Sequence, residues 1–177
     1  AYQVGVLKAI APLLPGDRNP FGVIVGTSAG AVSAAVLAAQ ARQWHRGVAA
    51  LEEVWAGFHV PQVFRADARA MLRAGLHWTL SALSGGLLLP SPRSLFDNSP
   101  LRELLSRHID WATLRDNVDA GVLQAVALCA TVYSGGRHTV FFDGAPEVAE
   151  WRRATRVGRR VALDLDHLMA SAAIPLL

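Results

Sequence analysis

The chain has 177 residues, enough for one domain with a sizeable hydrophobic core. Apolar residues make up 52% of it and charged residues 18%, which excludes an intrinsically disordered protein. The single cysteine, Cys129, excludes an intrachain disulfide, and the net charge of +3 favours anionic partners such as phospholipid head groups or nucleic acid only weakly.

The first half of the chain predicts a helix, a strand and then more helices. Apolar residues on one helical face predict a helix over residues 2–14. A β-branched run predicts a buried strand over 21–25, because a loop with two prolines precedes it and Gly26 follows it. Small residues continue as a helix over 28–41, and apolar residues spaced by three or four predict helices over 44–58 and 72–83.

The next part of the chain predicts two helices and a pair of strands. Ser99 is a candidate N-cap followed by a proline at the first helical position, and Asp110 is expected to cap a shorter helix. The apolar run 121–133 predicts a central strand. The "SGG" turn then returns the chain as a second strand over 137–142.

The last segment, "VALDLDHLMASAAIP", predicts the end of a strand and then a helix capped near Asp164 or Asp166. Strands that alternate with helices predict an α/β fold, here a three-layer α/β/α sandwich around a mostly parallel sheet. We expect residues 1–177 to belong to one domain. The start of the chain has no features of a signal peptide, so we expect a cytoplasmic or membrane-peripheral protein.

The stretch Gly26-Thr27-Ser28-Ala29-Gly30 fits two patterns with opposite implications. As G-x-x-x-G in an apolar run it predicts a transmembrane helix contact, and as G-x-S-x-G it predicts the nucleophile elbow of a hydrolase. The middle of the run is made of small residues, and no Trp or Tyr flanks it, so membrane insertion is poorly supported. The predicted strand before the motif and helix after it favour the elbow.

An elbow gives each residue of this motif a role. Ser28 is the candidate catalytic nucleophile, on a sharp and strained turn between strand and helix. We expect Gly26 and Gly30 to be required because a side chain at either position would collide with the turn. The helix start directs its free N–H groups at the site, and the Ala29 N–H is the candidate oxyanion donor.

Several segments together resemble the patatin-like phospholipase family. The elbow alone is common among esterases, but its early position combined with "ASAAIP" is much more specific. The segments that carry the resemblance are "AYQVGVLKAI", "VIVGTSAGAVSAAVLAA", "LFDNSPLRELLSRHID", "ATVYSGGRHTVFF" and "HLMASAAIPLL".

The resemblance implies an enzyme that hydrolyses acyl esters of phospholipids or lysophospholipids without a cofactor. It implies a Ser-Asp dyad with no catalytic histidine. The family's Gly-rich oxyanion loop and its D-G-G or D-G-A motif are expected before Ala1 and after Leu177, so residues 1–177 alone are expected to be inactive. A lipid-binding or regulatory module of the same fold is the alternative.

Two other residues are candidates for acid–base chemistry. Asp143 lies in a D-G-A sequence, but we interpret this sequence as a turn in preference to a base. The order Ser28, Asp143, His167 also permits a Ser-His-Asp triad of the α/β-hydrolase type. We interpret His167 as part of a helix cap in preference to a catalytic residue.

The remaining features have a structural and a functional interpretation each. The basic cluster with Trp151 is expected to be a solvated face or a contact with an anionic membrane surface, while nucleic-acid binding is less well supported. Residues 72–90 are expected to be core or an apolar lid. Cys129 is expected to be a buried, inert thiol, and the six histidines show no metal-ligand spacing, so no metal site is predicted. The basic cluster comprises Arg152, Arg153, Arg156, Arg159 and Arg160.

Overall fold

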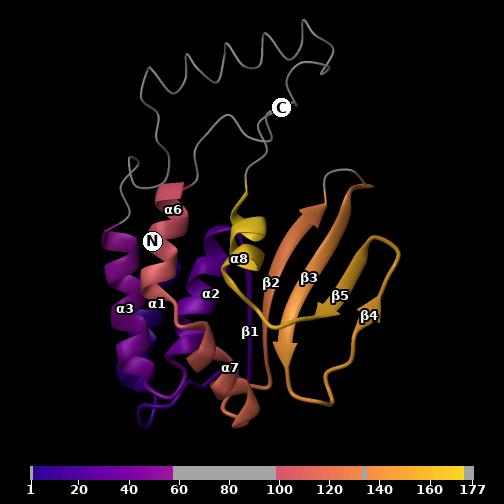
Figure 1. Cartoon of the computed structure of the whole chain (residues 1–177). Helices are drawn as coiled ribbons and strands as arrows, with labels where there is room; N and C mark the ends of the chain where they lie inside the picture. The colour runs from indigo at the N-terminus through magenta and orange to yellow at the C-terminus, as the bar shows by residue number, and fades with distance from the viewer. Residues whose placement is uncertain (1, 58–98, 133–134, 174–177) are drawn as a thin grey trace, which may run out of the picture. The chain divides into compact units, whose positions relative to one another are not determined.

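The computed structural model describes residues 2–57, 99–132 and 135–173 (Figure 1). Residues 1–57 and 105–173 form one compact unit. Of a second unit, 58–104 with 174–177, the described residues are 99–104, the beginning of one helix. The helix expected over 72–83 and the lid expected over 72–90 lie outside the described residues.

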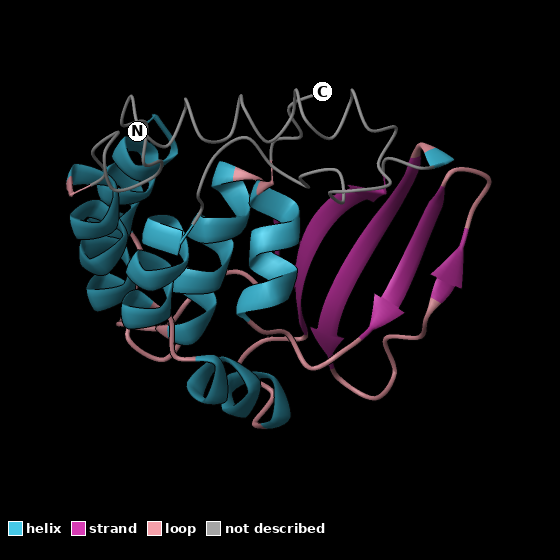
Figure 2. Cartoon of the chain, turned by 45° about the horizontal axis from the view of Figure 1, so that its top comes forward, coloured by secondary structure: helices cyan, strands magenta, loops and turns pink. Residues whose placement is uncertain are grey.

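The strands form one mixed five-stranded sheet in the order β1-β2-β3-β5-β4 (Figure 1). Figure 2 shows strands of this sheet, in magenta, beside the group of helices in cyan. Two pairs are parallel, β1 with β2 and β3 with β5, whereas β2–β3 and β4–β5 are antiparallel. The prediction of a mostly parallel sheet is therefore wrong, because two hairpins reverse the chain direction within the sheet. The strands are β1 Val23–Thr27, β2 Ala125–Val132, β3 Arg137–Gly144, β4 Trp151–Arg152 and β5 Arg156–Arg160.

Six α-helices are present in the described part of the chain. The expected first helix ends earlier than predicted, because a 3-10 turn over Ala11–Leu13 with a proline in its first positions follows it. Asp110 and Asp164 cap α7 and α8 as predicted, each accepting hydrogen bonds from first-turn N–H groups. The helices are α1 Tyr2–Ile10, α2 Ala29–Ala39, α3 Trp44–Ala56, α6 Ser99–His108, α7 Trp111–Asp119 and α8 Leu165–Ala172.

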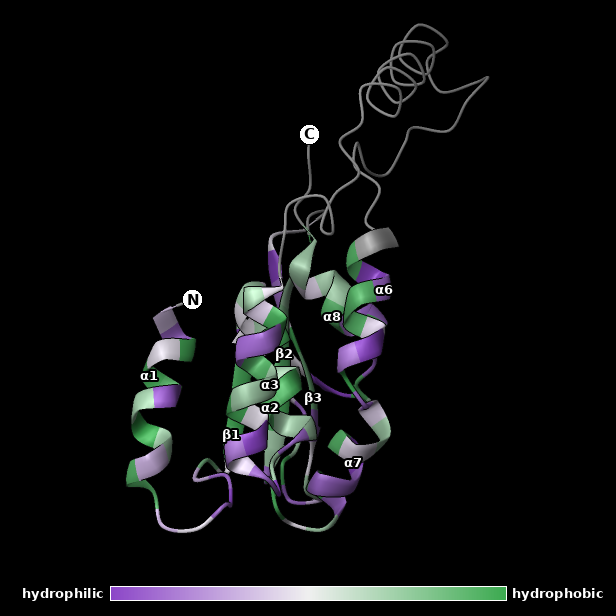
Figure 3. Ribbon diagram, turned by 90° about the vertical axis from the view of Figure 1, so that its left-hand side faces the viewer, coloured by the Kyte–Doolittle hydropathy of each residue, from purple (hydrophilic) through white to green (hydrophobic). Residues whose placement is uncertain are grey.

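The alanine-rich helix α2 occupies the centre of the larger unit. Every residue from Ala31 to Ala39 is buried, and α2 contacts β1, β2, α3, α7 and α8. Small side chains permit this close packing on several sides at once. In Figure 3, α1 lies on one side of the strands, and α7 and α8 lie on the other.

The C-terminal end of α2 is held by a buried side chain from α7. The Asn117 amide nitrogen donates to the carbonyl oxygens of Ala38 and Ala39 over 2.8 and 3.2 Å. The last carbonyls of a helix lack partners within the regular helix, and the Ala38 carbonyl otherwise accepts only from the turn that follows, including the Ala41 N–H. The bonds from Asn117 add a buried donor at this helix end.

No helix in the ranges that the structure describes is both long enough and apolar enough to span a bilayer.

Candidate active site

The backbone of Ser28 forms the junction between β1 and α2. Its dihedral angles are φ 53° and ψ −122°, and it is the one non-glycine residue with positive φ among the described residues. An L-residue adopts such a conformation only at a cost, and such strain is concentrated at functional sites. The strand, strained turn and helix predicted around Ser28 are therefore all present.

The two glycines of the motif differ in what their neighbours require. A Cβ on Gly26 would overlap the backbone of Gly30 and lie 2.6 Å from Ala31 Cα, so only glycine fits there. A Cβ on Gly30 would meet no described atom within 4 Å, because this position faces an apolar cavity of about 420 Å³ lined by α1, β1 and α2. The prediction that Gly30 is required for steric reasons is therefore wrong, and the tight contact is between Gly26 and the start of α2.

Ser171 on α8 joins the elbow to the neighbouring strand. The Ser28 N–H donates to Ser171 Oγ over 2.9 Å, and the Ser171 hydroxyl donates to the Cys129 carbonyl oxygen over 2.6 Å. Ser171 is 8% exposed. Sequence reasoning did not single it out, although a lone polar residue on an apolar helical face is a signal for a buried hydrogen bond.

The first turn of α2 leaves backbone donors beside Ser28. The N–H groups of Ala31 and Val32 donate to the Ser28 carbonyl oxygen over 2.8 and 3.4 Å. Those of Ala29 and Gly30 have no acceptor within the helix, because the first N–H groups of any helix lack one. Such donors, with the positive end of the helix dipole, can stabilise an oxyanion.

Asp143 lies too far along the sheet to contact Ser28. It pairs in register with Val126, which pairs with Ile24, four residues before Ser28. This corresponds to about 13 Å along the strands and about 10 Å across them, well beyond hydrogen-bond reach. Asp143 also lies within β3, so the interpretation of Asp143 and Gly144 as a turn is wrong.

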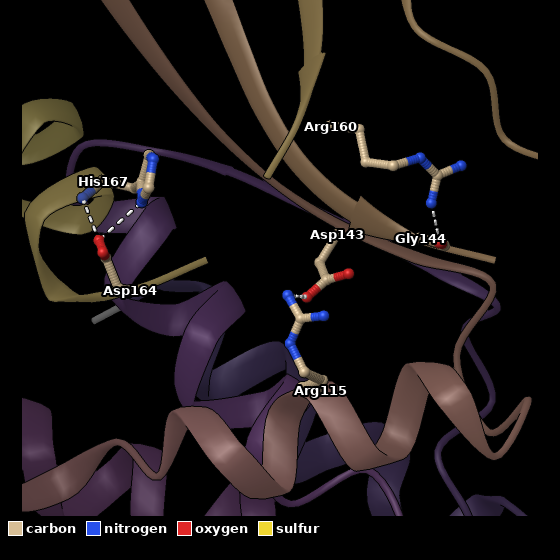
Figure 4. A network of polar contacts seen from close by, with 6 residues as sticks. All are labelled: Arg115, Asp143, Gly144, Arg160, Asp164 and His167. Carbon is tan, nitrogen blue, oxygen red and sulfur yellow. Dashed lines mark hydrogen bonds and ion pairs between the residues drawn. The ribbon is translucent and has the colours of Figure 1, made fainter. Parts of the chain in front are cut away.

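The carboxylate of Asp143 is paired with α7 instead (Figure 4). Its Oδ2 lies 2.8 Å from Arg115 Nη2, at an angle that makes an ion pair without a well-formed hydrogen bond. Asp143 is 5% exposed, and burial raises the pKa of its carboxyl group while Arg115 opposes the rise. The pair therefore connects α7 to the sheet.

His167 belongs to the cap of α8. Its backbone N–H and its Nδ1 lie 3.0 and 2.6 Å from Asp164 Oδ1, and its ring packs edge-on against Phe141 with 4.7 Å between centroids. Burial would raise the pKa of Asp164, but the bonds to His167 outweigh it and lower the pKa. Asp143 and His167 thus have separate partners (Figure 4), and they do not form the triad that the sequence order permits.

The arginine-rich segment forms the last two strands at one edge of the sheet, β5 and β4. All five arginines are exposed, but Arg159 lies 3.5 Å from Glu150, and Arg160 donates to the carbonyl oxygens of Gly144 and Ala145 and covers the Phe142 ring. The cluster is therefore not a uniform free basic surface. Cys129 is half-buried in β2, and no three potential metal ligands gather among the described residues.

Fold and elbow together define an α/β protein with a strained serine between a strand and a buried helix. The chain belongs to the patatin-like phospholipase family, a family of carboxylic ester hydrolases, whose family model matches residues 1–177. Membership implies lipid acyl hydrolase activity. No curated protein and no solved structure matches the chain.

Proposed function

We propose that the protein is a serine acyl hydrolase that cleaves ester bonds of phospholipids or lysophospholipids. The observation that carries the proposal is the strained Ser28 backbone between β1 and α2. A strand-to-helix turn of this kind exposes the hydroxyl of a nucleophile. Family membership supports the ester substrate. We also propose that the complete domain has the three-layer α/β/α arrangement expected from the sequence.

In this mechanism the Ser28 oxygen attacks the ester carbonyl carbon. The carbonyl oxygen becomes an oxyanion, which the Ala29 N–H at the start of α2 stabilises. Collapse of the tetrahedral intermediate expels the lysolipid or glycerol alcohol and leaves an acyl group on Ser28. Water then attacks the acyl-enzyme and releases the fatty acid.

The Ser28 proton needs an acceptor, because a serine hydroxyl is a poor nucleophile at neutral pH. We assign this role to an aspartate that follows "ASAAIP" in the family pattern, and not to Asp143. The register of the sheet and the ion pair with Arg115 support this choice.

The test, like the other activity measurements below, uses the protein in a form that extends through the aspartate proposed as the base. It measures reaction with a fluorophosphonate probe and with a p-nitrophenyl ester. We expect Ser28→Ala to abolish labelling and to lower ester hydrolysis by several powers of ten. Ser106→Ala, at an exposed serine of α6, is the matched control and should retain both. Labelling that survives in Ser28→Ala would refute the assignment. A folded protein that binds lipid but hydrolyses no ester would be a lipid-binding module of the same fold.

A further inference from the structure

A cavity of about 310 Å³ lies beside the elbow. Thr27 and Ser171 line it, the first joined to Ser28 by a peptide bond and the second by the hydrogen bond to its N–H. The cavity is therefore lined by two direct neighbours of the nucleophile. Its other polar lining residues are Thr131, His138 and Arg156.

The polar residues of the cavity share one face of the sheet. Thr131, His138 and Arg156 are register partners across β2, β3 and β5, so they form one row. Thr27 pairs with Cys129, and Cys129 pairs with Val140, so these three residues form a second row. This second row lies two residues along the strands from the row of Arg156. Side chains two residues apart on a strand lie on the same face. The row with Arg156 is thus about 7 Å beyond Thr27, towards the end of β1 that carries Ser28.

The charges in this cavity suit an anion. No carboxylate lines it, and within the described ranges the Arg156 guanidinium has no ion-pair partner, unlike Arg115 and Arg159. His138 Nδ1 lies 3.2 Å from Thr131 Oγ1. A guanidinium beside an imidazole and a hydroxyl is a set of donors that recognises phosphate.

We propose that this cavity is the subsite that binds the phosphate of the lipid substrate, with Arg156 and His138 as specificity-determining residues. The inference rests on the proposed function, because it places the ester at Ser28. In a glycerol lipid the ester and the phosphate are only a few bonds apart. His138 on β3 and Arg156 on β5 lie two and three strand spacings from β1, about 10 and 14 Å. A bound glycerol phosphate together with the extended arginine side chain spans the longer gap.

The experiment compares two esters that differ in the phosphate alone. Hydrolysis of 1-oleoyl-lysophosphatidate and of 1-oleoylglycerol is measured in the same neutral detergent micelles. We expect Arg156→Gln to lower kcat/KM for the lysophosphatidate by about 10- to 100-fold, the typical effect of losing a charged hydrogen bond. Hydrolysis of 1-oleoylglycerol should change less than about twofold. His138→Gln should act in the same direction with a smaller effect.

Arg152→Gln is the matched control, because Arg152 is exposed on β4 and does not line the cavity. It removes the same charge and should leave both rates unchanged. Equal losses on both esters in Arg156→Gln, or equal losses on the phosphate ester in Arg152→Gln, would overturn the subsite. So would an Arg156→Gln variant that retains full activity on the phosphate ester.

A binding measurement separates this inference from the proposed function. Titration calorimetry with sn-glycerol 3-phosphate should show binding that Arg156→Gln weakens about tenfold or more. If Ser28 proves unreactive, this result still supports or overturns the phosphate site by itself. Inorganic phosphate is expected to bind more weakly than glycerol 3-phosphate. Equal binding would identify a site for free phosphate and overturn its assignment to a lipid head group.

Discussion

The Ser28 N–H donates to the side-chain oxygen of Ser171, a residue 143 positions later in the chain. Through the onward bond to the Cys129 carbonyl, the strained turn is connected to both α8 and β2. The strain at Ser28 therefore has a specific restraint, one that lies outside the G-x-S-x-G motif itself.

Removal of the Ser171 hydroxyl should loosen the elbow. Ser171→Ala leaves the Ser28 N–H and the Cys129 carbonyl without this partner, and we expect a loss of about 1–3 kcal/mol in the free energy of unfolding. Fluorophosphonate labelling at a temperature where the variant is folded should be slower than in the unmodified protein. Ser171→Thr keeps the hydroxyl and should restore the labelling rate. A Ser171→Ala protein that is destabilised but labelled at the normal rate would limit Ser171 to a stabilising role.

The two glycines of the motif should respond differently to alanine. Gly26→Ala forces a Cβ into the backbone of α2, and we expect a destabilisation of about 2 kcal/mol or more. Gly30→Ala and Gly22→Ala add a Cβ where no described atom lies within 4 Å. The free energy of unfolding of both variants should therefore lie within about 1 kcal/mol of that of the unmodified protein. Denaturant unfolding of the three variants measures this. Equal sensitivity of Gly26 and Gly30 would contradict the difference seen in the structure.

Asp143→Asn tests whether this carboxylate takes part in catalysis. Its distance from the elbow predicts that hydrolysis of a p-nitrophenyl ester changes less than about threefold, whereas loss of a catalytic base costs several powers of ten. The steady-state rate of the folded variant decides between the two. A loss of that larger size would identify Asp143 as the base.

The same substitution has an expected pH dependence of stability. Burial raises the pKa of Asp143, so the folded protein holds this proton more tightly than the unfolded chain does. The contribution of Asp143 to the free energy of unfolding is then largest when the group is protonated, and it decreases as the pH rises from 3.8 through the raised pKa. The stability of the unmodified protein relative to Asp143→Asn should therefore fall over that interval in urea unfolding. A relative gain with rising pH would show that Arg115 outweighs burial.

His167→Ala separates a cap from a catalytic histidine. The ring contacts Asp164 and Phe141, so its loss should lower the melting temperature. Ester hydrolysis measured below that temperature should keep its rate and its pH profile. An activity loss of several powers of ten with an intact fold would revive a Ser-His-Asp mechanism.

Local chemistry in the sequence was sufficient to predict much of the elbow and the helix starts. The change from a β-branched run to small residues places β1 before α2, and short polar side chains at Asp110 and Asp164 identify two caps. These features depend on neighbours in the chain, so a sequence pattern records them.

Features that depend on pairing across the fold were missed. Nothing in the arginine-rich segment indicates that it forms β4 and β5, because these two strands are mostly exposed and carry no apolar alternation. The partners of Asp143 and Ser171 are 28 and 143 residues away in the chain. The open space beside Gly30 also depends on distant parts of the chain, because the cavity there is lined by α1 and β1 as well as α2.

The bonds from Asn117 and the bridge through Ser171 restrain α2 at both of its ends. The Asn117 carbonyl oxygen accepts the N–H groups of Val122 and Leu123, just before β2. A closed circuit results, from Ser28 along α2 to Asn117, along β2 to Cys129, and through Ser171 back to Ser28. A helix fixed in such a circuit cannot slide along its axis or rotate without breaking a buried bond. The position of Ser28 is thus fixed by this closed series of bonds and does not depend on the stiffness of the turn alone.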